Sequence, residues 1–190
     1  MQLSYTRDLV PGLPGMPFGE WNELSIVSYP AGAVIQPGIA VEVSAGLLYP
    51  LKDATTGGAF APKLVGVSLR DPMMENSYPP AAGTAVVAFA GYQIGQPVPV
   101  VRRGRVFVQT DNVGAWPEMG TVNVWHSSTG ANAQGVFTLT AVSAVAGAEI
   151  DALVAGVVGI RPEFAGSFTN GFGLATLTAI VELNLPSVQL

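Results

Sequence analysis

Glycine and proline interrupt this chain throughout, and that constrains its fold more than any other feature. The 190 residues include 23 glycines and 15 prolines, so one residue in five belongs to this pair, against about 12% in average usage. Both residues disfavour the interior of a helix. Hydrophobic residues nevertheless make up 49% of the chain, which is enough apolar surface for a core and the opposite of a disordered composition. The composition therefore predicts a turn-rich, mainly β protein.

Between the turns, apolar and polar residues alternate with a period of two, as they do in half-buried strands. The clearest stretch is Ala175 to Leu185, where the odd positions are apolar and most even positions are Thr, Glu or Asn. Similar stretches are Gly38 to Ser44, Lys63 to Arg70, Arg105 to Thr110, Thr121 to His126 and Val136 to Thr140. Strands recur about every ten residues, the spacing of sandwiches and barrels. We expect an all-β fold, a small β-barrel or a jelly-roll-like sandwich.

Helix formers gather in one place only, Ala144 to Val158. Gly147 and Gly156 interrupt that stretch, so we interpret it as strand and turn.

The N-terminal residues 1–20 are predicted to form an extended arm ahead of a single β domain, residues 21–190. Leu9 to Phe18 holds three prolines and two glycines, which exclude a helix and disfavour a central strand. The arm region also carries the apolar side chains of Tyr5, Leu9, Leu13, Met16, Phe18 and Trp21. Two interpretations stay open: the arm packs across its own domain, or it docks on another protein.

An internal similarity raises the question of two β halves, about 21–95 and 96–190. Residues 38–43 resemble residues 120–125, and residues 64–72 resemble residues 155–162. Common strand composition explains the same similarity, and we favour that explanation.

Charged residues are scarce, and the chain is acidic overall. Charged residues make up 11% of the chain and its net charge is −5, whereas soluble domains carry about 25%. This balance argues against broad binding to nucleic acid or to an anionic membrane. The segment MQLSYTRDLVPG lacks a basic region followed by an apolar run, so we expect no secretory signal. Two charge-free windows, 119–148 and 164–181, are interrupted by polar residues, which predicts no membrane span.

Side chains that carry chemistry are few. With no cysteine and His126 as the one histidine, disulfides, thiol nucleophiles and cysteine-based zinc sites are excluded. A serine hydrolase would depend on His126, and no Gly-x-Ser-x-Gly motif accompanies it. The acids Asp111, Glu118, Glu149 and Asp151 are available for a glycosidase pair, but we expect most of them to solvate turns. We therefore predict no catalytic residue, no cofactor and no metal site.

Three of the eight cations form one basic cluster, Arg102, Arg103 and Arg105. The cluster is either a contact for carboxylates of a partner or an edge strand whose charges block unwanted pairing. We favour the partner contact.

Five segments carry a family resemblance, in order along the chain. They are Gly12-Leu-Pro-Gly-Met16, Gly66-Val-Ser-Leu-Arg-Asp71, Arg103-Gly-Arg-Val-Phe-Val108, Gly120-Thr-Val-Asn-Val-Trp125 and the terminal strand Val181 to Leu185. Together they resemble the capsid cement, or decoration, proteins of tailed bacteriophages. Residues 147–173 depart from the pattern, and an insertion there would carry a different contact.

The resemblance implies a non-enzymatic virion protein, made in the host cytoplasm, that binds the capsid exterior and cements neighbouring major capsid proteins. It is expected to be a homotrimer at local three-fold positions or, as the alternative, a dimer at two-folds. The candidate contacts with the capsid or between subunits are Leu9, Leu13, Met16, Phe18, Trp21, Arg102, Arg103 and Arg105.

Two other classes of function stay open. One is a carbohydrate- or receptor-binding β module, with a shallow site lined by Trp116, Trp125 and Tyr92. The other is a hydrolase on a β scaffold that uses His126 and Asp111.

Overall fold

The computed structural model describes residues 14–18, 24–51, 64–71, 91–111, 122–125, 134–138, 150–152, 157–160, 167–169 and 175–185. Within these residues every regular element is a strand, and no helix is present that is long and apolar enough to cross a membrane. The strands are β1 (Pro17–Phe18), β2 (Ser25–Pro30), β3 (Ala40–Ser44), β4 (Leu47–Pro50), β5 (Leu64–Ser68), β6 (Pro97–Thr110), β7 (Asn123–Trp125), β8 (Phe137–Thr138), β9 (Ile150–Ala152), β10 (Val157–Ile160), β11 (Ser167–Thr169) and β12 (Ala175–Asn184).

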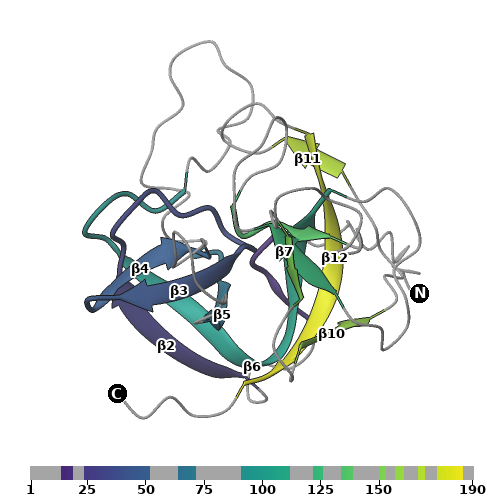
Figure 1. Ribbon diagram of the computed structural model, residues 1–190, viewed down its shortest axis with the longest axis horizontal. Helices are drawn as coiled ribbons and strands as arrows, with labels where there is room; N and C mark the ends of the chain where they lie inside the picture. The colour runs from purple at the N-terminus through teal and green to yellow at the C-terminus, as the bar shows by residue number, and fades with distance from the viewer. Residues whose placement is uncertain are drawn as a thin grey trace, which may run out of the picture.

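The long strand β6 lies at the centre of the sheet, and five other strands pair with it (Figure 1). Its first half pairs antiparallel with β2 and with β5. Its second half pairs antiparallel with β12 over eight positions and with β1 over two. β8 joins in parallel at Thr110. Both of the sequence halves considered above therefore contribute strands that pair with β6.

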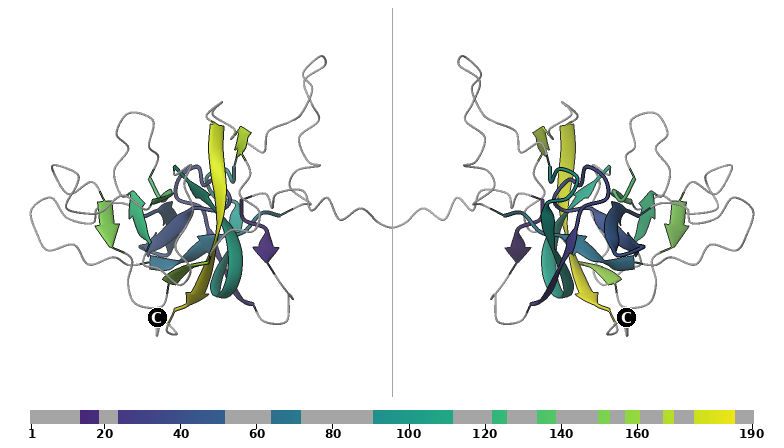
Figure 2. Two further views of the ribbon diagram at one scale, coloured as in Figure 1. Left: turned by 90° about the vertical axis from the view of Figure 1, so that its right-hand side faces the viewer. Right: turned by 90° about the vertical axis from the view of Figure 1, so that its left-hand side faces the viewer.

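The sheet curls into a half-barrel (Figures 1 and 2). From β6 it continues through β5 and β3 to β4. The residues that follow β2 also pair with β4. Ala31 forms a parallel bridge with Leu48, and the amide of Gly32 donates to the Leu48 carbonyl at 2.7 Å. The prediction of an all-β, barrel-like or jelly-roll-like fold is confirmed.

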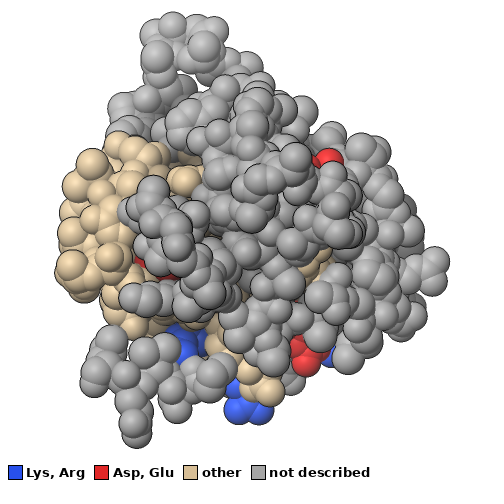
Figure 3. All heavy atoms as spheres, in the orientation of Figure 1, with Lys and Arg blue, Asp and Glu red and all other residues tan. Residues whose placement is uncertain are grey.

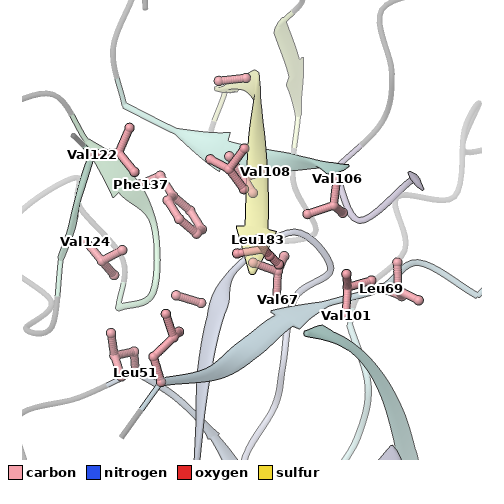
Figure 4. Close-up of a cluster of buried hydrophobic side chains, with 14 residues drawn as sticks. Leu51, Val67, Leu69, Val101, Val106, Val108, Val122, Val124, Phe137 and Leu183 are labelled. Carbon is pink, nitrogen blue, oxygen red and sulfur yellow. The ribbon is translucent and has the colours of Figure 1, made fainter. Parts of the chain in front are cut away.

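Two apolar cores are buried by this sheet, and β6 contributes to both. Val98 and Val100 belong to the core enclosed by the curl, together with buried side chains of β3, β4 and β5. Val106 and Val108 belong to a second core, in which side chains of β7, β8 and β12 converge on them (Figure 4). Val100 and Val101 are neighbours in β6 yet belong to different cores, because successive side chains of a strand point to opposite faces of the sheet.

The predicted strands lie where the alternation placed them. Gly38 to Ser44 contains β3, Lys63 to Arg70 contains β5, and Ala175 to Leu185 contains β12. Thr121 to His126 and Val136 to Thr140 contain the short strands β7 and β8, and Ala144 to Val158 contains β9 and the start of β10.

The largest difference is β6, which begins at Pro97 rather than near Arg105. Proline has no amide hydrogen, so a sequence that contains Pro97 and Pro99 argues against a central strand. In the structure the Pro99 carbonyl accepts a hydrogen bond from the Leu69 amide at 2.8 Å. Pro99 needs no amide hydrogen at this position, because it contacts Leu69 through its carbonyl oxygen alone.

Gly66 lies on β5 in close contact with β6. A Cβ atom at this position would lie 2.1 Å from the carbonyl oxygen of Val101 and 2.6 Å from Cγ1 of Val100. Backbone cannot yield as a flexible side chain can, so any residue larger than glycine pushes the two strands apart.

We predict that Gly66→Ala lowers the free energy of unfolding by about 3 kcal/mol, because β5 must separate from β6 to accommodate the methyl group. Gly46→Ala is the matched control. Its Cβ would meet nothing within 4 Å, so only its positive φ opposes the change, at a cost of about 1 kcal/mol. Urea denaturation followed by tryptophan fluorescence measures both, and equal losses would contradict the close approach.

Candidate functional site

The described part of the N-terminal arm is built into the domain. Between β5 and β6, the amide of Gly15 donates to the Phe107 carbonyl at 2.8 Å and the amide of Phe107 donates to the Met16 carbonyl at 2.9 Å. The amide of Arg70, just after β5, donates to the Gly15 carbonyl at 2.9 Å. Residues 14–16 thus link two strands of the sheet through backbone hydrogen bonds.

Only glycine fits at position 15. Its φ is +80°, a conformation that residues with a Cβ rarely adopt. A Cβ there would also lie 2.6 Å from the Arg70 amide nitrogen and 2.8 Å from Cβ of Pro37. The N-terminal arm is therefore held at a tight site between β5 and β6, the Gly15 slot, which only a residue without a side chain can fill.

Residues 14–18 pack on their own domain, as one of the two interpretations of the arm holds. Phe18 is half-buried and packs edge-to-face against Phe107 of β6, with ring centroids 5.7 Å apart and an interplanar angle of 81°. Met16 remains 42% exposed. The other predicted arm contacts, Leu9, Leu13 and Trp21, lie outside the described residues.

The arginine cluster lies in the middle of β6, around Gly104, and its three side chains differ in exposure. Arg102 is buried at 9% exposure, whereas Arg103 and Arg105 are exposed. The interpretation of this segment as a charged edge strand is wrong: at Arg103, β6 pairs with both the start of β2 and the end of β12. The charges therefore do not protect an edge, and the exposed pair points away from the sheet.

Strand register brings several of the predicted contacts together on one surface. Phe18 of β1 lies opposite Arg105, and Glu182 of β12 lies opposite Arg105 on the other side. The Arg105 Nε donates to Oε2 of Glu182 at 2.9 Å in a half-exposed ion pair. We call this surface, made of Met16, Phe18, Arg103, Arg105 and Glu182, the arginine face. Basic and acidic side chains come to the surface together at the lower edge of Figure 3.

Sequence patterns missed Glu182 as a member of this surface. It lies 77 residues from Arg105, and the only signal in the chain is its place on the polar face of the alternating stretch Ala175 to Leu185. Which residue of β6 it would meet depends on the register of β12 against β6, which no local pattern encodes.

The shallow aromatic site considered for a carbohydrate- or receptor-binding module does not form from Tyr92 and Trp125. Tyr92 is fully buried, and its hydroxyl donates to the Leu69 carbonyl at 2.7 Å. Trp125 is 6% exposed and belongs to the same core. That prediction is wrong for both residues, because burial of their large rings completes the core inside the curl. Trp116 lies outside the described residues.

Asp111, considered for a hydrolase, has a structural role at the end of β6. Its Oδ2 accepts hydrogen bonds from Nε1 of Trp125 at 2.6 Å and from Oγ1 of Thr138 at 3.1 Å. The carboxylate thereby ties β6 to β7 and β8. The other residues named for hydrolysis, His126, Glu118, Glu149 and the side chain of Asp151, lie outside the described part of the chain.

Comparison with known proteins decides the family. Residues 1–183 match the family model described as Structural cement protein (E217 gp24/Pam3 gp6) of phages. The chain belongs to this family. The resemblance stated from the sequence is confirmed, and with it a structural role in association with capsid proteins, at the virion capsid.

A solved structure, "The capsid of Myoviridae Phage XM1", contains a chain of the same fold. The TM-score is 0.58 at 15% sequence identity, over 94% of this chain and 96% of that chain. At this identity the similarity shows the shared fold. No curated protein sequence matches the chain.

We predict that deleting residues 1–18 lowers the free energy of unfolding by about 3 kcal/mol, since three backbone hydrogen bonds are lost at about 1 kcal/mol each. Deleting residues 1–13 retains these three bonds, so this contribution is kept. Denaturant titrations give the free energy of unfolding of both truncated proteins. Equal values for the 1–18 and 1–13 deletions would contradict a stabilising role of residues 14–18.

Proposed function

We propose that this protein binds the outer surface of the assembled capsid and holds neighbouring major capsid proteins together. The observation that carries the proposal is the match of residues 1–183 to the structural cement family. The protein acts without catalysis, as a structural component. It is made in the host cytoplasm and contacts neither nucleic acid nor membrane, in keeping with its net charge of −5.

The arginine face is the surface that we assign to the capsid protein. Four of the eight cations lie in the described residues, and Arg103 and Arg105 are the exposed ones among them. In a chain of net charge −5, they form a local positive site that recognises carboxylates of a partner. Both arginines stand on a strand that is paired along both edges, so binding requires little ordering of the backbone.

The arm is the second part of the proposed capsid contact. Pro14 is buried, and Gly15 is hydrogen bonded to Phe107, two residues along β6 from Arg105. The anchor at Gly15 therefore lies beside the arginine face. In this proposal Leu9 and Leu13 extend the contact along a capsid protein, and Pro11 between them limits the entropy lost on binding.

We further propose that the protein self-associates, as a homotrimer at local three-fold positions of the capsid or, failing that, as a dimer at two-folds. Repeated contacts around an axis let each copy bind a different capsid subunit, so the assembly holds several subunits together through avidity.

We predict that Arg103→Glu weakens capsid binding by about tenfold or more, because it replaces an attractive charge with a repulsive one at an acidic partner. Capsids of the encoding phage, prepared without this protein, are mixed with the variant and pelleted, and the bound fraction is measured against protein concentration.

Ser28→Glu is the matched control, since Ser28 is exposed on β2 and lies outside the arginine face. It adds a negative charge of similar exposure and is expected to leave binding near wild type. Equal binding by Arg103→Glu and wild type would refute the assignment of the arginine face to the capsid.

We predict that deleting residues 1–13 also weakens co-sedimentation with capsids, because the extended contact is lost while the anchor at Gly15 remains. Circular dichroism and the denaturation midpoint show whether the domain is still intact. Capsid affinity unchanged in the folded truncation would remove residues 1–13, including Leu9 and Leu13, from the contact.

A further inference from the structure

A second surface, unlike the arginine face, lies at the start of β6. It is made of residues 31–35, 44–48 and 92–96, which we call the apolar end. All three segments lack Asp, Glu, Lys and Arg. In Figure 3 the described surface on the left side is almost entirely free of charge, whereas basic groups appear at the lower edge.

Backbone contacts hold the three segments side by side. Residues 31–35 form the middle segment. On one side the amide of Gly95 donates to the Ala31 carbonyl at 2.8 Å, and Ile35 and Tyr92 form an antiparallel bridge. On the other side Ala31 bridges Leu48, and the Gly32 amide donates to the Leu48 carbonyl.

Exposed large hydrophobic side chains concentrate at this end. Among the described residues five such side chains are exposed, and three of them lie here: Ile94 at 72%, Val34 at 39% and Leu47 at 36%. The turn that presents Ile94 is closed on itself, since the Gln96 amide donates to the Gln93 carbonyl at 3.0 Å and the Gln96 Oε1 accepts from the Gln93 amide at 2.8 Å. Ile94 is thus presented at the tip of a hydrogen-bonded turn.

We propose that the apolar end is the contact between copies of this chain, the surface nearest the symmetry axis of the oligomer. This inference rests on the self-association put forward under Proposed function and names the surface that carries it. Near a rotation axis of any order, a side chain faces its own symmetry mates. A charged group would meet a like charge there, whereas an uncharged apolar group is complementary to itself.

Charge complementarity favours a second copy as the occupant and assigns the two surfaces to different partners. Each copy carries a net charge of −5, so copies repel one another except where their contacting surfaces are free of charge. Arg105 of the arginine face is paired with Glu182, so the exposed charge of Arg103 makes this surface better suited to an acidic partner than to a second copy of itself. Arg103 lies six residues along β6 from Pro97, or about 20 Å from the apolar end. One copy can therefore use both surfaces at once.

Single cysteines test the proposal directly, because the chain has none of its own. Val34→Cys, Leu47→Cys and Ile94→Cys are each oxidised mildly, in solution and on capsids. We expect disulfide-linked pairs from at least one of them, since cysteine Cα atoms must approach within about 7 Å to link. Ile26→Cys is the matched control, being 40% exposed but outside the apolar end. Linkage at none of the three positions, or equally at Ile26, would overturn the proposal.

Ile94→Asp provides an independent readout of the same surface. Sedimentation equilibrium of the full chain is expected to show self-association weakened by about tenfold or more, since each copy would place a charge against its mate. Ile26→Asp is expected to keep the wild-type mass. A wild-type protein that stays monomeric up to about 100 μM, or an Ile94→Asp oligomer as stable as wild type, would overturn the proposal.

Capsid co-sedimentation separates this inference from the proposed function. Ile94→Asp that keeps its oligomeric mass yet no longer binds capsids would show that the apolar end contacts the capsid protein, which overturns the inference and leaves the cement role intact. Arg103→Glu with unchanged capsid binding but a normal oligomeric mass would count against the arginine face alone.

Discussion

Pairing along both edges of β6 is the constraint on which the rest of this structure depends. The strand is 14 residues long and bonds to β2 and β5 in its first half and to β12 and β1 in its second. Its side chains contribute to both apolar cores. Because β6 pairs with strands of both parts, the curl at β3 and β4 and the layer at β7, β8 and β12 are fixed relative to each other.

The N-terminal arm is attached to β6 through residues 15–18. Gly15 fills a slot between β5 and β6 that excludes any side chain, and Phe18 packs on Phe107. In the capsid contact that we propose, a segment anchored at this fixed point loses less conformational freedom on binding than a tail attached by a free hinge.

The scarcity of charge has a spatial explanation in the described residues. The exposed arginines stand together on the outer face of β6, with Glu182 beside them, whereas the segments around Ile94, Val34 and Leu47 have no charge at all. A cement protein needs surfaces that bury well against other proteins, and charged residues are depleted at the cores of such surfaces. In our proposal, the separation of a basic surface from an uncharged one lets one small protein contact two kinds of partner.

The sequence by itself determined the fold class and most strand positions, because period-two alternation between glycine- and proline-rich turns leaves few other solutions. The family followed from a different signal, the resemblance of five short segments to cement proteins, which the family match confirmed. The sequence also predicted an arm and a basic cluster. Tertiary structure alone decided that β6 begins at Pro97, that Arg105 meets Glu182, and that Tyr92 and Trp125 are buried rather than presented to a ligand. Those outcomes depend on strand register and on which face the sheet curls around. Register and curl arise from contacts between residues far apart in the chain, and a local pattern contains no information about them.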